Sequence, residues 1–238
     1  MREAVILAGG FGTRLRHVVS DVPKPMAPVC GRPFLSHLMD HLQVYGFDHI
    51  VLSTGYMHEK IEECYGGRYR DMEISYARET TPLGTGGAIV NALRHCRGDV
   101  VTVLNGDTLF RIDHDRLDRF FSQHNTRLAI VLRHVDDTSR YGAVRTDSTG
   151  RIVQFAEKCE AHGPGTINGG IYRLHRSLLE GFAWGEAFSF EKELMQVRYT
   201  QDEYYAYPAD DYFIDIGVPD DYFKIQQDLQ SNPVDPAL

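Results

Sequence analysis

The chain has 238 residues, of which 42% are hydrophobic and 24% charged, a composition that fits a folded globular protein and excludes wholesale disorder. Its formal charge of −8 argues against a broad nucleic-acid interface, because such interfaces place positive charge along the phosphate backbone. This length allows one large domain or two small ones, and we predict one α/β domain over residues 1–230 with a polar tail over 231–238.

The cysteines and the apolar segments give no sign of a redox centre or a membrane anchor. Cys30, Cys64, Cys96 and Cys159 are scattered and form no C-x-x-C pair, which argues against a zinc knuckle or a redox motif. No apolar run approaches the roughly 20 residues that cross a bilayer, and the N-terminus leads directly into a strand rather than a signal peptide. We therefore expect a cytoplasmic protein without nucleic-acid or membrane partners. The sequence does not decide whether the protein forms a homo-oligomer.

A glycine-rich loop follows the first apolar segment, residues 4–7, which has the length and composition of a strand buried on both faces. Glycines let backbone N–H groups approach an anion, and Arg14 and Lys24 add the positive charge that a triphosphate needs. A turn without a ligand would explain the glycines but not the two cations. We predict a phosphate loop with Arg14 and Lys24 as catalytic cations. The other predicted nucleotide contacts in it are Leu7, Ala8, Gly9, Gly10, Gly12 and Thr13.

Two well-known phosphate loops do not fit this spacing. In the dinucleotide fingerprint G-x-G-x-x-G, read from Gly10, the third glycine would fall where Leu15 stands. The P-loop needs a lysine after its last glycine, whereas Thr13 directly follows Gly12. The loop therefore indicates another class of nucleotide site.

Predicted strands and helices alternate along the first half of the chain, as in a Rossmann-like, doubly wound and mostly parallel sheet. They cover residues 33–46 (helix), 49–53 (strand), 58–65 (helix), 73–76 (strand), 88–97 (helix), 99–107 (strand), 116–124 (helix) and 128–132 (strand). His37 and His41 are spaced i, i+4 on the first helix. Because the chain shows neither H-E-x-x-H nor an obvious third ligand, we favour ordinary helix histidines over a zinc site.

A second glycine loop, residues 79–87, precedes the helix predicted at 88–97. At the carboxyl end of a strand, such a loop can reach the base and ribose of a nucleotide held by the first loop. The residues that we expect to do so are Gly84, Thr85 and Gly86. A plain turn with a helix start explains the same residues, and the sequence leaves both readings open.

Two aspartates are the candidate ligands of Mg²⁺, which takes one or two carboxylates together with phosphate oxygens. Asp107 follows Asn105 and Gly106 at the end of an apolar strand, at the edge where open α/β sheets bind ligands. Asp215 lies in the apolar stretch 212–217, where an unpaired carboxylate is costly. We predict that both hold the metal and that Asn105 and Gly106 contact the nucleotide. A capping role for Asp107 and a hydrogen-bonded structural role for Asp215 are the alternatives.

The motif Asp113-His114-Asp115 resembles the D-x-D of metal-dependent glycosyltransferases. We interpret it instead as the start of the helix at 116–124, because an aspartate there accepts unpaired backbone N–H groups and suits the helix dipole.

The second half of the chain begins with a hairpin, residues 142–146 and 151–155, joined by turn residues. The hairpin ends at Glu157-Lys158, where Lys158 is a candidate catalytic cation for a second phosphate, although an exposed ion pair is the favoured interpretation of these two residues alone. Further elements are predicted at residues 168–172 (strand), 189–195 (helix capped by Ser189), 204–207 (strand), 212–217 (strand) and 218–230 (helix). The candidate contacts for this second phosphate and the ligand that carries it are Tyr141, Gly142, Glu157, Lys158, Asn168 and Gly169.

Taken together, these motifs resemble the sugar-1-phosphate nucleotidyltransferase family in kind and in order. The matching segments are Gly9–Leu15 with Lys24-Pro25, Asn105-Gly106-Asp107, Glu157-Lys158, Asn168-Gly169-Gly170 and Asp215-Ile216-Gly217. The resemblance implies a Rossmann-like fold with a nucleotide part over about 1–110 and a sugar-phosphate part over about 111–230. It also implies that an NTP and a sugar 1-phosphate give an NDP-sugar and pyrophosphate. Arg14 and Lys24 would then bind the triphosphate, and Asp107 and Asp215 would bind Mg²⁺. Lys158, together with the other five candidate contacts of the second half, would bind the sugar phosphate.

Within that family, residues 16–28 depart from the usual proline and threonine after the Arg-Leu of the loop. This run, with residues 82–87 and 105–107, is similar to D-glycero-α-D-manno-heptose 1-phosphate guanylyltransferases. That implies GTP, a heptose 1-phosphate and a glycan precursor for lipopolysaccharide, capsule or S-layer as product. Mannose or glucose 1-phosphate with another base, a D-x-D glycosyltransferase and a non-catalytic nucleotide-sensing domain remain alternatives. The role of Arg16 stays open.

Overall fold

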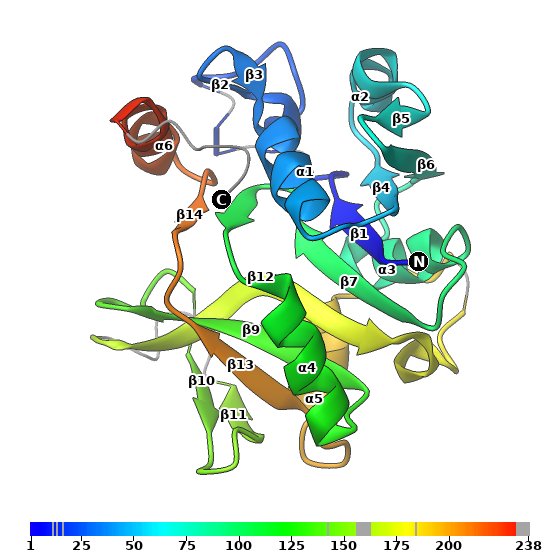
Figure 1. Cartoon of the computed structure of the whole chain (residues 1–238), viewed down its shortest axis with the longest axis vertical. Coiled ribbons are helices and arrows are strands. Elements are labelled where there is room, and N and C mark those ends of the chain that lie inside the picture. The colour runs from blue at the N-terminus through cyan, green and yellow to red at the C-terminus, as the bar shows by residue number, and fades with distance from the viewer. Residues whose placement is uncertain are drawn as a thin grey trace.

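The computed structural model describes residues 1–10, 12, 14–15, 17–141, 143–155, 163–183 and 185–231. Within these residues the main sheet has eight strands in the order β13-β9-β12-β7-β1-β4-β6-β5 (Figure 1). Their bounds are β1 Glu3–Leu7, β4 His49–Thr54, β5 Arg68–Tyr69, β6 Met72–Arg78, β7 Val100–Asn105, β9 Leu128–Val135, β12 Gly165–His175 and β13 Tyr205–Ala209. Strands β6, β4, β1, β7, β9 and β13 point the same way, and β12 and β5 run against them. The sheet is mostly parallel, as the sequence predicts.

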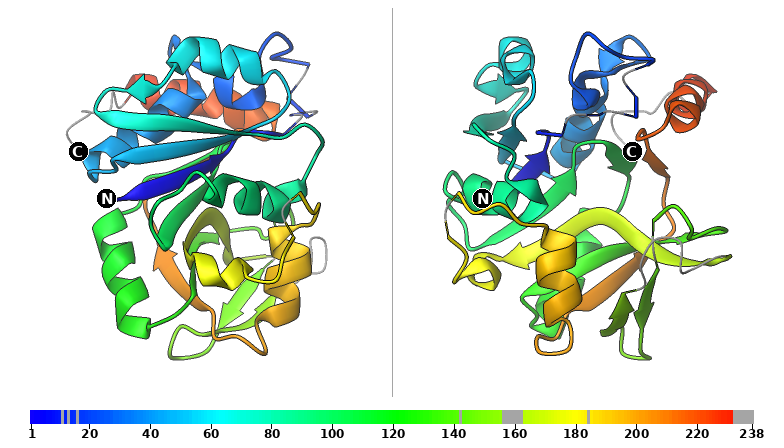
Figure 2. Two further views of the ribbon diagram at one scale, coloured as in Figure 1. Left: turned by 90° about the vertical axis from the view of Figure 1, so that its right-hand side faces the viewer. Right: turned by 180° about the vertical axis from the view of Figure 1, so that it is seen from behind.

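Helices cover both faces of this sheet (Figure 2). The α-helices are α1 Phe34–Val44, α2 His58–Tyr65, α3 Gly84–Leu93, α4 His114–His124, α5 Gln196–Arg198 and α6 Pro219–Ser231, and a π-helix spans Phe190–Met195. Ala4 and Ile6 of β1 pack into a hydrophobic cluster with α1, α2, α4 and α6. Val5, between them, packs into a second cluster with α3 and the π-helix. The alternation of side chains along the strand therefore buries β1 on both faces, as its uninterrupted apolar sequence predicts.

Three two-stranded sheets flank the main one, and one of them brings two distant aspartates together. They pair β2 Pro28–Val29 with β3 Arg32–Pro33, β8 Thr108–Phe110 with β14 Phe213–Asp215, and β10 Val144–Thr146 with β11 Ile152–Phe155. In the β8–β14 pair Asp215 lies opposite Thr108, and the Ile216 N–H donates to the Asp107 carbonyl oxygen at 3.0 Å. This antiparallel pair brings together two aspartates that are more than a hundred residues apart in the sequence.

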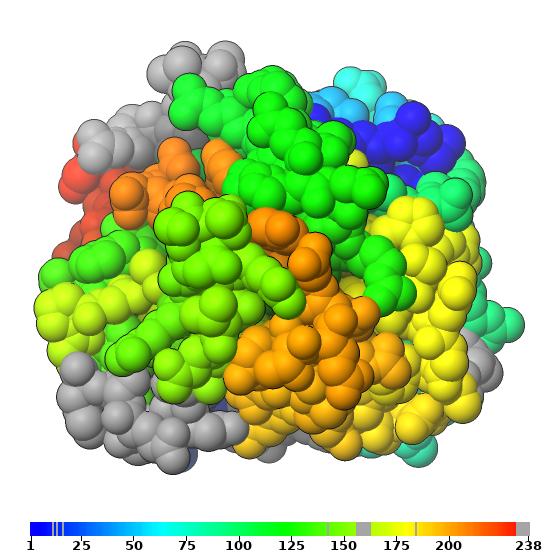
Figure 3. Space-filling view, turned by 90° about the horizontal axis from the view of Figure 1, so that it is seen from below, coloured from blue at the N-terminus to red at the C-terminus, as the bar shows by residue number. Residues whose placement is uncertain are grey.

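The hairpin predicted before residue 156 is present and packs against the chain that leads into β13. The Ile152 N–H donates to the Tyr204 carbonyl at 2.8 Å, and the Ala206 N–H donates to the Gly150 carbonyl at 2.9 Å. Seen from below, the hairpin and the segment before β13 lie side by side on the surface (Figure 3). The turn closes through the Gly150 N–H and the Asp147 carbonyl at 3.1 Å, as the turn residues predict.

Two helices depart from the predicted form. Helix α3 begins at Gly84 rather than at residue 88 and ends at Leu93, so most of the second glycine loop is its first turn. Glycine lowers helix propensity, which hides this start in the sequence. The segment that Ser189 caps, with its hydroxyl accepting from the Lys192 N–H at 3.2 Å, is a π-helix. Helix α4 starts as interpreted, because the Asp113 carboxylate accepts from the Arg116 N–H at 2.9 Å.

The glycines of α3 allow the helix to lie directly against the segment before the π-helix. A Cβ on Gly84 would stand 2.5 Å from the Phe188 carbonyl oxygen, and one on Gly87 would stand 2.2 Å from the Glu186 carbonyl oxygen. The Gly86 N–H donates to the Phe188 carbonyl at 2.9 Å. Close backbone packing therefore requires glycine at these positions.

Gly87→Ala should lower the free energy of unfolding by about 1–3 kcal/mol, because the new methyl group must displace backbone. Gly67→Ala is the matched control, since a Cβ there meets nothing within 4 Å. Urea unfolding of both variants measures the difference. Equal stability of the two variants would contradict the close packing of α3.

A half-buried histidine, His41 of α1, and a buried histidine, His114 of α4, lie next to each other. The His114 ring is fully buried, lies 5.4 Å from the His41 ring between centroids, and has no hydrogen-bond partner among the described residues. The His41 Nε2 is 2.9 Å from the Ile112 carbonyl oxygen. Burial lowers the pKa of His41 to about 4, and burial together with the charges of His41, Arg2 and Arg173 lowers the pKa of His114 well below its ordinary value. Both rings are therefore neutral in the folded protein at neutral pH.

Acid should destabilise the fold through these two rings. Below pH 6.5 the unfolded chain binds protons that the folded chain excludes, so stability is lost progressively as the pH falls toward 4. From pH 7.5 to 5.5 a histidine that stays neutral in the folded protein contributes a loss of about 1.4 kcal/mol in total. Urea unfolding at pH 7.5 and 5.5 measures the slope. It should be reduced in His114→Phe and retained in His134→Gln, an exposed position on β9; an unchanged slope in His114→Phe would contradict the prediction.

Candidate active site

A cleft of about 700 Å³ opens at the carboxyl ends of β1, β4, β6 and β7. It is lined by Leu7, Gly9, Gly10, Gly12, Arg14, Lys24, Pro25, Gly55, Tyr56, Glu79, Thr80, Thr81, Pro82, Gly84, Thr85, Ala88, Asn105, Asp107, Glu191 and Gly217. Both predicted glycine loops and the end of the predicted central strand contribute to its walls. Parallel strands present their carboxyl ends at one edge of a sheet, which is why these separate segments meet.

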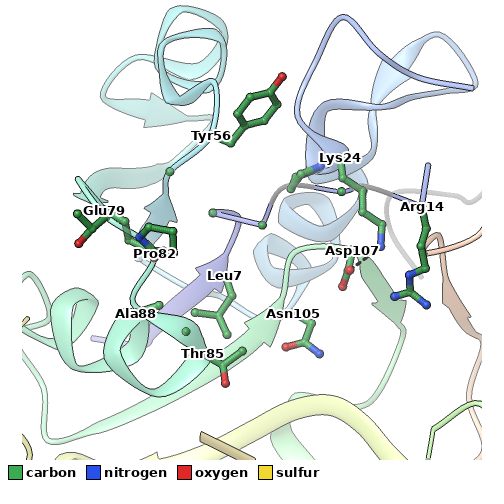
Figure 4. Close-up of a pocket in the computed structure, with 18 of the residues that line it drawn as sticks. Leu7, Arg14, Lys24, Tyr56, Glu79, Pro82, Thr85, Ala88, Asn105 and Asp107 are labelled. Atoms are coloured by element: carbon green, nitrogen blue, oxygen red, sulfur yellow. Dashed lines mark hydrogen bonds and ion pairs between the residues drawn. The ribbon is translucent and has the colours of Figure 1, made fainter. Parts of the chain in front are cut away.

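The cleft has one charged end and one end of mixed character (Figure 4). Arg14, Lys24 and Asp107 lie at the charged end. Pro82 lies toward the opposite end, in the turn that leads into α3, and Tyr56 lies on that side of Lys24, next to the segment between β4 and α2. An elongated ligand with a polyanionic end and a ring at the other end matches this distribution.

Among the described residues, three that are predicted to contact a nucleotide do not line the cleft. They are Ala8, Gly86 and Gly106, and their backbone N–H groups donate to Ser53, Phe188 and Leu7 carbonyl oxygens respectively. Gly106 also allows β7 to approach β1, because a Cβ on it would stand 2.5 Å from the Leu7 carbonyl oxygen. Their proposed contacts with a ligand stay predictions.

At the charged end, the Lys24 ammonium lies between Asp107 and Asp215. Its Nζ is 2.6 Å from Asp107 Oδ2 and 3.7 Å from Asp215 Oδ1, and the lysine side chain is only 9% exposed. The Gly217 N–H donates to Asp215 Oδ1 at 2.7 Å. Burial, followed by repulsion from Asp107, raises the pKa of the Asp215 carboxyl, and Lys24 partly offsets this. The predicted carboxylate pair is therefore assembled around one cation.

This pair fits a magnesium ion. Two carboxylates beside an open cleft leave the other positions of an octahedral ion to water and phosphate oxygens, which is how Mg²⁺ is commonly bound. When both carboxylates are ionised they carry one negative charge more than the single Lys24 ammonium neutralises, which favours a further cation. Among the residues described, no cluster of three or more histidine, cysteine, aspartate or glutamate side chains forms a metal cage. The other candidate motif, Asp113–Asp115, does not line the cleft.

Glu191 is a residue of the cleft wall that the sequence analysis did not single out. Its Oε2 accepts from the Thr85 hydroxyl at 2.5 Å and from the Ser189 hydroxyl at 3.1 Å, and its Oε1 accepts from the Tyr172 hydroxyl at 3.1 Å. The Tyr172 hydroxyl in turn accepts from Asn168 Nδ2 at 2.8 Å. Glu191 thus connects the second glycine loop with β12. The one sequence signal was a glutamate two residues after a helix cap, which favours a structural role.

Glu79, at the end of β6, is a second such residue. Its Oε2 accepts from the Leu83 N–H at 3.1 Å and its Oε1 from the Ser53 hydroxyl at 3.2 Å. Burial raises the pKa of this carboxyl. The carboxylate holds the turn between β6 and α3 in place, and that turn forms one wall of the cleft.

The predicted sugar-phosphate residues are only partly described. Asn168 accepts from the Gly170 N–H through its Oδ1 at 2.9 Å, and a Cβ on Gly169 would stand 2.6 Å from the Phe110 ring. Tyr141 is half-buried, with its ring 6.3 Å from that of Phe213. Thr13, Gly142, Glu157 and Lys158 lie outside the described residues, as does Arg16. The sugar-phosphate assignments therefore stay predictions.

A family model described as "Nucleotidyl transferase" matches residues 3–232. The chain belongs to this nucleotidyl transferase family. It is 44% identical over 231 residues to a D-glycero-alpha-D-manno-heptose 1-phosphate guanylyltransferase of Aneurinibacillus thermoaerophilus, covering 96% of this chain and 98% of that one. It is 40% identical to the enzyme of the same name from Campylobacter jejuni, covering 93% and 97%.

The crystal structure of HddC from Yersinia pseudotuberculosis complexed with GMP-PN has the same fold. It aligns with a TM-score of 0.83 and 35% identity over 96% of this chain and 100% of that one. The resemblance inferred from the motifs is confirmed, and so is the α/β fold class. Among the residues described, no helix of this family member is long and apolar enough to cross a membrane.

Proposed function

We propose that this nucleotidyl transferase transfers the guanylyl group of GTP to D-glycero-α-D-manno-heptose 1-phosphate, giving GDP-heptose and pyrophosphate. The observation that carries the reaction class is the convergence of Arg14, Lys24 and Asp107 at one end of a single cleft, with the Asp215 carboxylate 3.7 Å from the Lys24 ammonium. The choice of GTP and heptose is supported by the two guanylyltransferases that match this chain over nearly their whole length. We further propose Mg²⁺ as cofactor, a cytoplasmic location and a product that serves as a glycan precursor.

The chemistry needs little from the protein except placement and charge. The second pKa of a phosphate monoester is about 6, so a sugar 1-phosphate is largely a dianion at neutral pH and needs no general base. One of its oxygens attacks the α-phosphorus in line; the new P–O bond forms as the bond to pyrophosphate breaks, and pyrophosphate leaves with the electron pair. The enzyme must bring one polyanion against another, which cations at the charged end of the cleft allow.

Three basic side chains supply positive charge to the two phosphate groups, and two aspartates can hold a metal ion. Arg14 and Lys24 hold the triphosphate, and Lys158 is proposed to hold the incoming sugar phosphate. Asp107 and Asp215 would hold Mg²⁺, which, when bound, supplies neutralising charge and polarises phosphoryl oxygens. The opposite end of the cleft, with Tyr56 and Pro82, is left for the base.

The decisive experiment is a matrix of pyrophosphate-release assays in Mg²⁺ with GTP, ATP, CTP and UTP against heptose, mannose and glucose 1-phosphates. Release with GTP and heptose 1-phosphate alone supports the proposal. Another productive pair would overturn the substrates but keep the reaction. No pyrophosphate from any pair would overturn the reaction class and favour a nucleotide-binding domain; release of a free nucleoside diphosphate from an NDP-sugar would instead indicate a glycosyltransferase.

Arg14→Gln should lower kcat/KM about a hundredfold, the effect of removing a preorganised electrostatic donor worth about 3 kcal/mol. Arg116→Gln on α4 removes the same charge from a side chain that is 70% exposed and outside the cleft. That control should keep the full rate. Steady-state pyrophosphate release gives both values; comparable losses in the two variants would mean that Arg14 acts only through net charge.

A further inference from the structure

Lys24 occupies the position between the two aspartates where a bound cation would be expected. The lysine belongs to a short 3₁₀-helix, Lys24–Met26, whose Pro25 and Met26 are buried, so its backbone is anchored. Its ammonium reaches Asp107 at 2.6 Å and Asp215 at 3.7 Å (Figure 4 shows the first contact). The described structure thus places an internal cation in contact with both predicted metal ligands.

Two glycines next to Lys24 leave room for its side chain to reach the aspartates. A Cβ on Gly12 would stand 3.0 Å from Lys24 Cβ, and one on Gly217 would stand 3.1 Å from Lys24 Nζ and 2.8 Å from Asp215 Oδ1. Any larger residue at Gly217 would crowd both the ammonium and the carboxylate. Two loops therefore contribute glycine where the lysine and the aspartates meet.

An ammonium and a divalent ion that bind the same pair of carboxylates weaken each other's binding. The ammonium already neutralises one of the two negative charges, and a metal would meet its repulsion at close range. The lysine also lines the end of the cleft that receives the triphosphate, beside Arg14. Phosphate oxygens offer the ammonium alternative acceptors of higher charge, so a nucleotide can draw it away from the aspartates.

We propose that Lys24 is an internal competitor for the metal site: without nucleotide its ammonium holds Asp107 and Asp215, and a divalent cation binds tightly only together with a nucleotide that takes the ammonium over. The inference rests on the proposed function, because it assumes that a nucleoside triphosphate binds in the cleft. A permanently structural ion pair predicts the reverse, since loss of the lysine would then disorganise the two carboxylates and weaken metal binding.

The test measures metal binding directly, with no turnover. Mn²⁺ serves as the probe, and the loss of the free-ion signal in electron paramagnetic resonance reports binding to the full chain. In the absence of nucleotide, Lys24→Met should bind one Mn²⁺ about tenfold or more tightly than wild type, a coupling of ordinary size. Asp215→Asn added to Lys24→Met should remove this site. Lys224→Met, which breaks a lysine–aspartate pair on α6 away from the cleft, should behave as wild type.

Adding GTP without a sugar phosphate completes the comparison. GTP should strengthen Mn²⁺ binding in wild type, beyond its own affinity for Mn²⁺ measured without protein, and this enhancement should shrink in Lys24→Met. Equal or weaker nucleotide-free Mn²⁺ binding by Lys24→Met would overturn the inference. Should Lys24→Met fail to fold by circular dichroism, Lys24→Gln, whose amide can still donate to Asp107, gives the same comparison. Pyrophosphate release by wild type tests the proposed function separately, so either can fail alone.

Discussion

The site depends on the antiparallel pairing of β8 with β14. Strand β8 continues the chain directly after Asp107, and β14 ends at Asp215, so their register brings the two carboxylates to one ammonium. The two carboxylates are half-buried and repel each other. The fold tolerates this repulsion because Lys24 lies between them and the Gly217 N–H donates to Asp215. A few backbone hydrogen bonds between two three-residue strands therefore fix the geometry of the charged end of the cleft.

Glycines let the rest of the cleft close around that end. Helix α3 lies against residues 186–188 only because Gly84 and Gly87 carry no side chain, and this contact brings Thr85 to Glu191. Glu191 in turn accepts from Tyr172, which accepts from Asn168 on β12. Because the Glu191 carboxylate can only accept, the Tyr172 hydroxyl donates to it and accepts from Asn168. The loop predicted to face the nucleotide is thereby connected to the strand predicted to face the sugar phosphate.

Much of this arrangement could be predicted from the sequence, for identifiable reasons. The apolar run of β1, the glycine loop after it and the alternation of helices with strands are local signals, and the mostly parallel sheet follows from them. The strand ends then place Gly9, Asn105 and Asp107 at one edge without further information. Asp215 could be singled out because a carboxylate in an apolar stretch needs a partner.

What could not be predicted lies in contacts between distant segments. Nothing local distinguishes Glu191 from a helix-start glutamate, and its position in the cleft depends on where the π-helix packs against α3. The start of α3 was misplaced because glycines chosen for close packing have the same sequence signature as a loop. The contact of Lys24 with both aspartates was also missed. A lysine after a phosphate loop predicts an anion contact, and only the folded chain shows which anions it meets first.

The charge balance at this end of the cleft suggests how a protein of net charge −8 receives a polyanion. With both carboxylates ionised, the charges of Arg14 and Lys24 are cancelled by those of Asp107 and Asp215, so this end alone attracts a free triphosphate weakly. The nucleotide arriving as its Mg²⁺ complex would change this balance, because the carboxylates gain a partner and both cations become available to phosphate oxygens. Under the proposed function, these four side chains would therefore favour the metal–nucleotide complex over the free nucleotide.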